Sequence, residues 1–206
     1  AAEVNKIMRS ELAVVADVES VFPILVQLSS EKQSVYGAAW QSAEARAVWL
    51  EKIVNLKKSG YSLSCGRPSV GDGVNPREFI NSVPSLAGIM GLDPSDIIVT
   101  TDVGQHQMWA AQYYPVTRPR SFLTSGSLGT MGFGLPAAIG ATFGAPDRTI
   151  CCFFGDGGFQ MNIQELGTIM EQQAPVKMIL LNNNYLGNVR QWQDLMFGGR
   201  HSFTHM

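Results

Sequence analysis

Two short polar motifs, separated by an apolar stretch, carry the residue types of a magnesium–diphosphate site. Gly155-Asp156-Gly157 places a carboxylate between two glycines, and Asn182-Asn183 supplies neutral amide oxygens, with 27 positions between Asp156 and Asn183 (183 − 156). Mg²⁺ prefers hard oxygen ligands, usually one or two carboxylates, and completes its octahedron with phosphate oxygens and water. Glycine lets the backbone approach a phosphate closely. The spacing fits one helix and one strand between two loops at the same edge of a sheet.

Each of these residues also has a plainer interpretation. Asp156 could cap the start of a helix, and the asparagine run could be a polar turn. His106 lies at the start of an expected helix and could either donate to a phosphate or cap and pack. Met131 could fill a gap in a core. Glu165, on the helix between the two motifs, is expected to be a solvated or locally paired charge.

Alternating helices and apolar strands are expected to position these motifs. From residue 75 onwards the sequence predicts an α/β domain with a mainly parallel sheet and helices on both faces. TICCFF and VKMILL are apolar throughout, as expected for strands covered on both faces. The predicted helices are Pro76–Met90, Gln105–Tyr113, Leu135–Phe143, Phe159–Gln172 and one from about Gly187. The predicted strands are Asp96–Thr101, Ser121–Thr124, Arg148–Phe154 and Val176–Asn182.

Four of the predicted strands are followed by loops rich in glycine or asparagine. These loops are Gly104-Gln105, Gly126–Met131, Gly155–Gly158 and Asn182–Tyr185. In open α/β sheets, ligands bind outside the carboxyl ends of the strands. The four loops are therefore expected to converge at one edge of the sheet.

The first 75 residues are organised differently. A strand is predicted over Leu12–Ala16 and a helix over Glu19–Leu28, and one strand with one helix cannot bury each other well. We therefore interpret residues 1–35 as the tail of a preceding α/β domain. Residues 36–75 are predicted to be a linker that contains a helix over Ala43–Lys58, and residues 76–206 the α/β domain. Both ends are expected to be truncations of a larger protein.

Composition narrows the class of protein. The chain has 206 residues, of which 45% are hydrophobic and 16% charged, and its net charge is −2. Without a Lys/Arg block, nucleic acid is not an expected partner. No apolar run reaches the roughly 18 residues of a membrane span, and no signal-peptide pattern opens the chain. Cys151 and Cys152 are expected to be buried thiols, and with Cys65 they fit a cytoplasmic protein.

Several segments resemble thiamin diphosphate (ThDP) enzymes, and most closely the catalytic large subunit of the acetolactate synthase family. They are VGQHQMWAAQYY, RPRSFLTSGSLGTMGFGLPAAIGA, GDGGFQMNIQELGTIMEQQAPVKMILLNNNYLG and VRQWQ. The resemblance is strong over about residues 96–200, and residues 1–35 resemble the end of that family's FAD-type middle domain. It implies the ThDP-binding fold, with ThDP and Mg²⁺ as cofactors and FAD in the complete subunit.

The resemblance also implies roles for individual residues. The side chains of Asp156 and Asn183 and the main-chain carbonyl of Tyr185 would bind Mg²⁺. Met131 would wedge ThDP into a bent shape, and Trp192 would favour a larger second substrate, although a Trp on a final helix is more often core or interface. The full set of implied ThDP contacts is Val103, Gly104, Gln105, His106, Gly129, Met131, Gly155, Gly157, Gly158 and Tyr185.

The implied reaction decarboxylates pyruvate and joins the hydroxyethyl unit to a second 2-ketoacid, either pyruvate or 2-ketobutyrate. The products lead to valine, leucine and isoleucine. In this family the site forms between two subunits of a homodimer or tetramer, and a small regulatory subunit can accompany it. The activating glutamate belongs to a domain outside these residues, so the fragment alone is expected to be inactive.

Two alternatives to acetolactate synthase stay open. One is another ThDP enzyme, such as glyoxylate carboligase, pyruvate oxidase or a 2-ketoacid decarboxylase. The other is a non-catalytic module that binds ThDP or a nucleotide. Two positions also depart from the family's usual motifs: Ser127 replaces the second glycine of SGG, and Asn188 replaces the methionine of LGMV. Neither removes an implied metal ligand, but Asn188 could alter packing around the cofactor.

Overall fold

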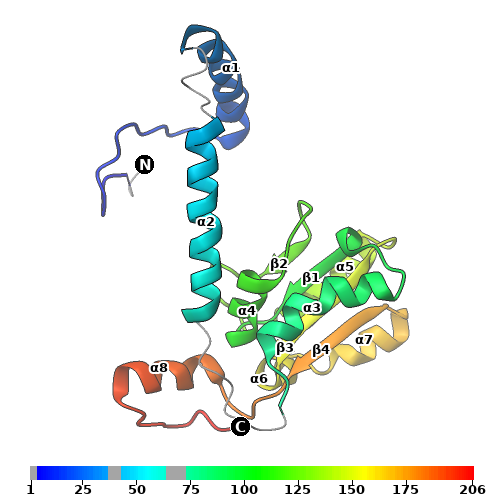
Figure 1. The fold of residues 1–206 in the computed structure, drawn as a ribbon. Helices are drawn as coiled ribbons and strands as arrows, with labels where there is room; N and C mark the ends of the chain where they lie inside the picture. The colour runs from blue at the N-terminus through cyan, green and yellow to red at the C-terminus, as the bar shows by residue number, and fades with distance from the viewer. Residues whose placement is uncertain (1–3, 37–42, 64–72) are drawn as a thin grey trace. The chain divides into compact units, whose positions relative to one another are not determined.

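The computed structural model describes residues 4–36, 43–63 and 73–206, and the chain divides into two units, 1–70 and 71–206. The first unit contains helices α1 (Val18–Tyr36) and α2 (Ala43–Leu63) (Figure 1). The second unit contains the sheet and the remaining helices. The division falls within the predicted linker, and the assignment of residues 1–35 to a preceding domain stays a prediction.

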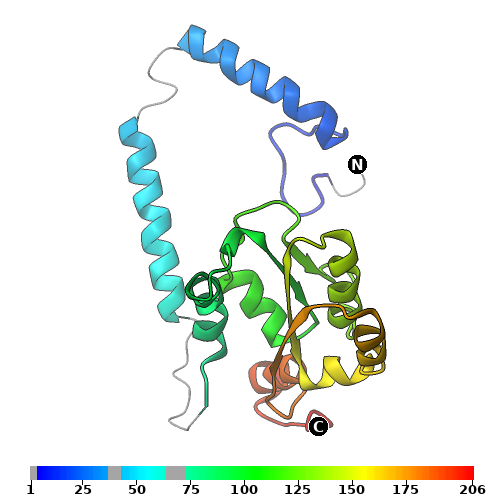
Figure 2. The same cartoon turned by 90° about the vertical axis from the view of Figure 1, so that its right-hand side faces the viewer.

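A four-stranded parallel sheet lies at the centre of residues 71–206 (Figures 1 and 2). Its strands are β1 (Ile97–Thr101), β2 (Phe122–Thr124), β3 (Thr149–Gly155) and β4 (Val176–Leu181), in the order β2-β1-β3-β4. All three pairings are parallel, with Val99 opposite Phe122, Ile97 opposite Thr149 and Ile150 opposite Val176. The predicted parallel sheet is therefore confirmed.

Helices cover both faces of this sheet, as predicted. On one face, α3 (Pro76–Ile89) and α4 (Gln105–Tyr113) pack on β1 and β3. On the other, α5 (Gly134–Gly144), α6 (Asp156–Met161) and α7 (Glu165–Gln172) do so. Successive side chains of a strand point to opposite faces, so Cys151 joins the first core and Cys152 the second. Both thiols are free and buried as expected, whereas Cys65 lies outside the described residues.

Local signals account for several element boundaries. The side chain of Asn75 accepts a hydrogen bond from the backbone N–H of Arg77 at 3.1 Å, and Pro76 occupies the first turn of α3. The last helix, α8 (Gly187–Phe197), ends at Gly198 in the left-handed conformation. The predicted bounds of α4 match the structure. Three predicted strands of the sheet differ from the structure by one residue at one end, and the strand predicted over Arg148–Phe154 is shifted by one residue at both ends.

Two predicted elements are wrong. Residues 12–15 form no strand, and within the described part of the chain they have no sheet neighbour to satisfy strand hydrogen bonds. The single helix predicted over Phe159–Gln172 is instead divided into α6 and α7 by a turn at residues 162–164. There the side chain of Asn162 donates to the carbonyl of Gly132 at 2.7 Å, a tertiary bond that competes with continuation of the helix.

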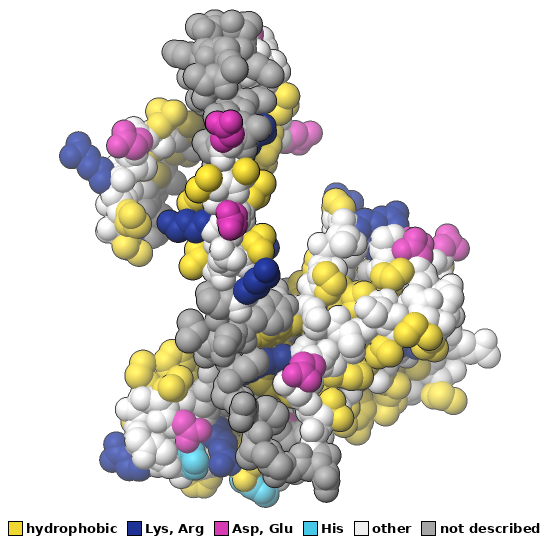
Figure 3. All heavy atoms as spheres, viewed as in Figure 1, with side chains coloured by type: hydrophobic (Ala, Val, Ile, Leu, Met, Phe, Trp, Pro, Cys, Tyr) yellow, Lys and Arg dark blue, Asp and Glu magenta, His cyan; other side chains and the backbone are white. Residues whose placement is uncertain are grey.

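The first unit consists of long helices with exposed apolar side chains. Helix α2 continues to Leu63, beyond the predicted end at Lys58. Phe22 on α1 is 59% exposed and Trp49 on α2 is 60% exposed. Hydrophobic and charged side chains are mixed along the surface of α2 (Figure 3). None of the helices in the described ranges combines the length and apolar character needed to cross a membrane.

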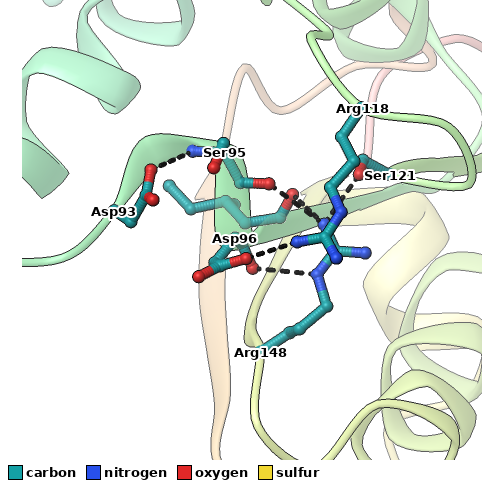
Figure 4. Close-up of polar contacts among 7 residues, drawn as sticks. Asp93, Ser95, Asp96, Arg118, Ser121 and Arg148 are labelled. Atoms are coloured by element: carbon teal, nitrogen blue, oxygen red, sulfur yellow. Dashed lines mark hydrogen bonds and ion pairs between the residues drawn. The ribbon is translucent and has the colours of Figure 1, made fainter.

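The amino ends of three strands are tied together by one arginine (Figure 4). The Arg148 guanidinium donates to the carbonyls of Ser95, Asp96 and Ile97 and to the hydroxyl of Ser121. Arg118 pairs with the Asp96 carboxylate beside it. This cluster fixes the amino edge of the sheet and leaves the loops at the carboxyl edge to form a pocket.

Candidate functional site

A pocket of about 220 Å³ lies at the carboxyl ends of the strands. It gathers twelve of the residues singled out in the sequence, from the loops that follow all four strands. They are Val103, Gly104, Gln105, His106, Gly129, Met131, Gly155, Asp156, Gly157, Gly158, Asn183 and Tyr185. The structure thus brings the two polar motifs and the glycine loops into one place, while their individual roles stay predictions.

Two other singled-out residues lie elsewhere. Trp192, on α8, is 56% exposed and does not line this pocket. Its role in substrate choice stays a prediction. Glu165 begins α7 and accepts a hydrogen bond from the Thr168 hydroxyl at 2.8 Å, so it is the locally paired charge that the sequence predicted.

His106 lines the pocket with an unsatisfied ring nitrogen. The side chain is only 5% exposed, and its Nε2 has no hydrogen-bond partner. Burial lowers the pKa of His106 below 6.5, and the nearby carboxylates of Asp102 and Asp156 oppose this shift without reversing it. The imidazole is therefore neutral at pH 7. Because buried polar atoms are almost always paired in folded proteins, Nε2 is suited to a polar ligand in the pocket.

The asparagine run forms a tight turn and still leaves oxygen available for a metal. Asn182 Oδ1 accepts from the N–H of Asn184, and Asn183 Oδ1 accepts from the N–H of Tyr185, each at 3.0 Å. Asn184 adopts a left-handed conformation with φ 59°. A carboxamide oxygen carries two lone pairs, so Asn183 Oδ1 can stabilise the turn and also coordinate an ion. The turn and ligand interpretations are compatible.

The loop after β2 requires glycine for backbone reasons. Gly129 and Gly132 have φ of 70° and 88°, in the left-handed region that favours glycine. A Cβ at Gly132 would also lie 2.7 Å from Asn162 Nδ2. This conformation brings Gly129 and Met131 to the pocket wall.

Several lining residues were missed by the sequence analysis. They are Trp109, Leu181, Leu186, Gly187 and Val189. Trp109 lies one helical turn after Gln105, a spacing that could have identified it. Asn188, one of the two departures from the family motif, also lines the pocket, and its buried Oδ1 has no partner.

The segment around α8 closes one side of the pocket. Leu186 N–H donates to the Thr204 carbonyl at 2.8 Å, and Met206 N–H donates to the Asn184 carbonyl at 2.9 Å. The Arg190 guanidinium lies 3.9 Å from the centre of the Tyr185 ring. These contacts hold the final residues beside the turn that carries Asn183.

A comparison with known protein families identifies the family of this chain. Residues 102–206 match the family model described as thiamine pyrophosphate enzyme, C-terminal TPP binding domain; thiamine pyrophosphate and ThDP are the same compound. The chain belongs to this family. The matched range contains every loop that lines the pocket.

Curated relatives of this family member are acetolactate synthase large subunits and related plant enzymes. The chain is 44% identical over 196 residues to acetolactate synthase isozyme 1 large subunit of Escherichia coli, a match that covers 95% of this chain and 31% of the relative. It is 41% identical to the acetolactate synthase large subunit of Parasynechococcus marenigrum, covering 100% of this chain and 30% of the relative. It is 38% identical to acetolactate synthase 2, chloroplastic, of Nicotiana tabacum, a match that covers 100% of this chain and 29% of the relative. The chain spans about a third of the length of these relatives.

A solved structure supports the fold of this family member. The chain resembles the thiamine diphosphate-dependent 4-hydroxybenzoylformate decarboxylase of Rhodococcus jostii RHA1 with a TM-score of 0.58 and 28% sequence identity. The match covers 68% of this chain and 25% of that protein.

The residues in the pocket fit the cofactor of the family. The donor set combines a carboxylate, Asp156, with an amide oxygen, Asn183, which suits Mg²⁺ bound to phosphate oxygens. Gly157 and Gly158, at the first turn of α6, line the same pocket, and glycine lets the backbone approach a phosphate closely. The unpartnered nitrogen of His106 adds a polar group able to contact a diphosphate.

Proposed function

We propose that this chain is the cofactor-binding part of an acetolactate synthase large subunit. The proposal is carried by one observation: the Asp156 and Asn183 motifs share a pocket in a chain that is 44% identical to such a subunit over 95% of its length. The reaction would decarboxylate pyruvate and join the hydroxyethyl unit to a second 2-ketoacid, pyruvate or 2-ketobutyrate.

The pocket residues would divide the binding work between metal, diphosphate and ring. Asp156, Asn183 and the Tyr185 carbonyl would hold Mg²⁺. The amides of Gly157 and Gly158, with Gln105 and His106, would hold the diphosphate, and Val103, Gly104 and Gly155 would complete that wall. Gly129 and Met131 would contact the aminopyrimidine. When bound, ThDP supplies the electron sink for decarboxylation, and the protein supplies position and electrostatics.

Further features of the complete protein belong to the same proposal. They include FAD, a homodimer or tetramer, a small regulatory subunit and a role in branched-chain amino-acid synthesis, all implied by the resemblance of the quoted motifs. The relatives' names support a subunit partner, since several are named as large subunits. Trp192 would contribute to the choice of second substrate, and its exposure on α8 leaves the side chain accessible. The free thiols of Cys151 and Cys152 favour a reducing, cytoplasmic location.

A second candidate is another ThDP-dependent 2-ketoacid decarboxylase. The solved structure with a similar fold is named as a decarboxylase of this kind. The metal and diphosphate contacts would be the same, and the two candidates differ in whether a second 2-ketoacid accepts the two-carbon unit.

The deciding experiment measures acetolactate formed from pyruvate by the complete protein, with and without ThDP and Mg²⁺. Acetolactate that depends on both cofactors is the expected result. Acetaldehyde, acetate, or tartronate semialdehyde from glyoxylate would assign the protein to a related ThDP enzyme. No turnover, with ThDP bound, would indicate a binding module.

A further inference from the structure

Asp102 is a fully buried carboxylate that the metal and diphosphate assignments do not use. It follows β1 directly, is 1% exposed, and accepts three backbone hydrogen bonds. Oδ1 accepts from Val103 at 2.8 Å and Gly132 at 3.0 Å, while Oδ2 accepts from Gly134 at 2.8 Å. Three N–H donors stabilise a buried negative charge, which would otherwise be costly.

Two of these hydrogen bonds reach across the sheet edge to the loop after β2. Gly132 and Gly134 lie 30 and 32 positions along the chain from Asp102. Gly134 also begins α5, so the carboxylate fixes the start of that helix. The same loop carries Gly129 and Met131 into the pocket. Its conformation therefore depends on a residue that belongs to a different strand.

Asp102 also lies directly against the first turn of α6. A Cβ at Gly158 would fall 2.2 Å from Asp102 Oδ1, so the carboxylate occupies the space where a side chain would be. A Cβ at Gly134 would likewise fall 2.7 Å from the backbone nitrogen of Asp102. In addition, Asp102 N–H donates to the Phe153 carbonyl of β3 at 2.8 Å. One residue thus links the end of β1 to β3, to the loop after β2 and to the first turn of α6.

We propose that Asp102 is a positioning residue of the cofactor site, whose carboxylate holds the loop bearing Gly129 and Met131 in register with the α6 turn bearing Asp156. What the site binds rests on the proposed function. In the proposed function these two loops would contact opposite ends of the cofactor, so the distance between them would have to match its length. A single carboxylate that is hydrogen-bonded to one loop and packed against the other sets this distance before any ligand enters.

The test is Asp102→Asn in the complete protein. Asparagine has the same shape, but its NH₂ group replaces one acceptor and opposes the N–H of either Gly132 or Gly134. Residue-resolved hydrogen exchange should show the amide of Gly132 or of Gly134 exchanging about tenfold faster or more, the scale expected for losing one bond to a charged group. Amides of β1 itself should be unchanged.

Cofactor affinity supplies the second readout. ThDP titrated in saturating Mg²⁺ should bind the variant about tenfold more weakly, while the KM for pyruvate at saturating ThDP stays the same. Asp96→Asn is the matched control, because Asp96 immediately precedes β1 at the opposite edge and is exposed. This control should leave both readouts unchanged.

Three outcomes would overturn the proposal. The first is that Asp102→Asn binds ThDP as tightly as the wild-type protein does, a result that leaves the proposed function intact. A second is rapid exchange of Gly132 and Gly134 amides in the wild-type protein, as rapid as at Gly126, a result that does not require the variant to fold. The third is no ThDP binding by the wild type, which removes the proposed function and the positioning role together.

Discussion

At the scale of single residues, the two unpartnered buried polar atoms of the described chain both belong to pocket residues. They are His106 Nε2 and Asn188 Oδ1. The sequence left His106 open between phosphate donor and packed side chain. The structure shows that the side chain is packed and that its ring retains an unused nitrogen. Packing of the His106 side chain is therefore compatible with a contact between its ring and a phosphate.

Burial of His106 should make the cofactor-free protein less stable in acid. Its folded-state pKa lies below 6.5, so the unfolded state binds more protons as the pH falls below 6.5. By linkage, this residue's contribution is fully present above pH 6.5 and is lost as the pH falls towards the folded-state value. In His106→Gln the loss of unfolding free energy between pH 7.5 and 5.5 should be smaller than in the wild type, as measured by urea denaturation.

The control for this pH effect is His201→Gln, because His201 is partly exposed and does not line the pocket. That variant should keep the acid-dependent loss seen in the wild type. An equal loss in His106→Gln and wild type would contradict the assignment of the effect to His106.

Asp156→Ala should remove Mg²⁺-dependent binding of ThDP. Loss of a group behind a metal ligand already costs about 10–100-fold in metal affinity, so loss of the carboxylate that we propose as a ligand should weaken binding by more than about hundredfold. The measurement is ThDP titration of the complete protein at fixed Mg²⁺. Asp147→Ala, an exposed carboxylate near the amino end of β3, is the control. Unchanged ThDP affinity in Asp156→Ala would refute the metal assignment.

At the scale of elements, substituting alanine for two glycines of α5 should change the stability of the protein in opposite directions. A Cβ at Gly134 would meet the backbone of Asp102 at 2.7 Å, whereas a Cβ at Gly140 has open space around it. Gly134→Ala should destabilise the protein by about 1–3 kcal/mol through overpacking. Gly140→Ala should stabilise it by about 0.5–1 kcal/mol, because alanine restricts the unfolded chain and favours helix. Chemical denaturation of the two variants measures both changes in the free energy of unfolding. Equal changes in the two variants would contradict the close packing at Gly134.

The pattern of apolar residues and the glycine- and asparagine-rich loops were enough to predict the elements that build the pocket. Apolar runs such as TICCFF located the strands to within one residue, and the position of loops after strands predicted their convergence. The division between α6 and α7 was not predictable, because it depends on a bond from Asn162 to Gly132, 30 positions away. Asp102 was missed for a similar reason: its partners at Gly132 and Gly134 become neighbours only when the sheet forms.

β4 also differs from its expected environment for a reason beyond local sequence. VKMILL is apolar enough for a covered strand, yet Met178 is 45% exposed and Leu180 is 46% exposed. β4 is the outer strand of the described sheet and pairs only with β3 there. Hydrophobicity predicted the strand, and its place in the strand order determines its exposure.

At the scale of the whole molecule, the two units should differ in independent stability. Among residues 1–70 whose burial is described, none is buried, and α1 contains Pro23. Isolated helices without tertiary packing are marginal in water, so a peptide of residues 1–70 should have low helicity and no cooperative transition. Residues 71–206, which contain both cores, should unfold with a sigmoidal thermal transition. Circular dichroism of the two pieces makes the comparison, and a cooperative transition in residues 1–70 would contradict it.

The order of strands in the sheet has a consequence for biosynthesis. β1 is central, and Ile97 pairs with Thr149, 52 positions later in the chain (149 − 97). At a synthesis rate of about 5–20 residues per second, the ribosome takes roughly 3–10 s to make the partner after β1. During that time α3 and α4 can cover one face of β1, and α5 becomes able to cover the other. What remains unpaired until β3 emerges is the edge of β1 that hydrogen-bonds to it. A strand edge with unpaired backbone groups is a template for aggregation, so the nascent chain is most in need of a chaperone during this interval.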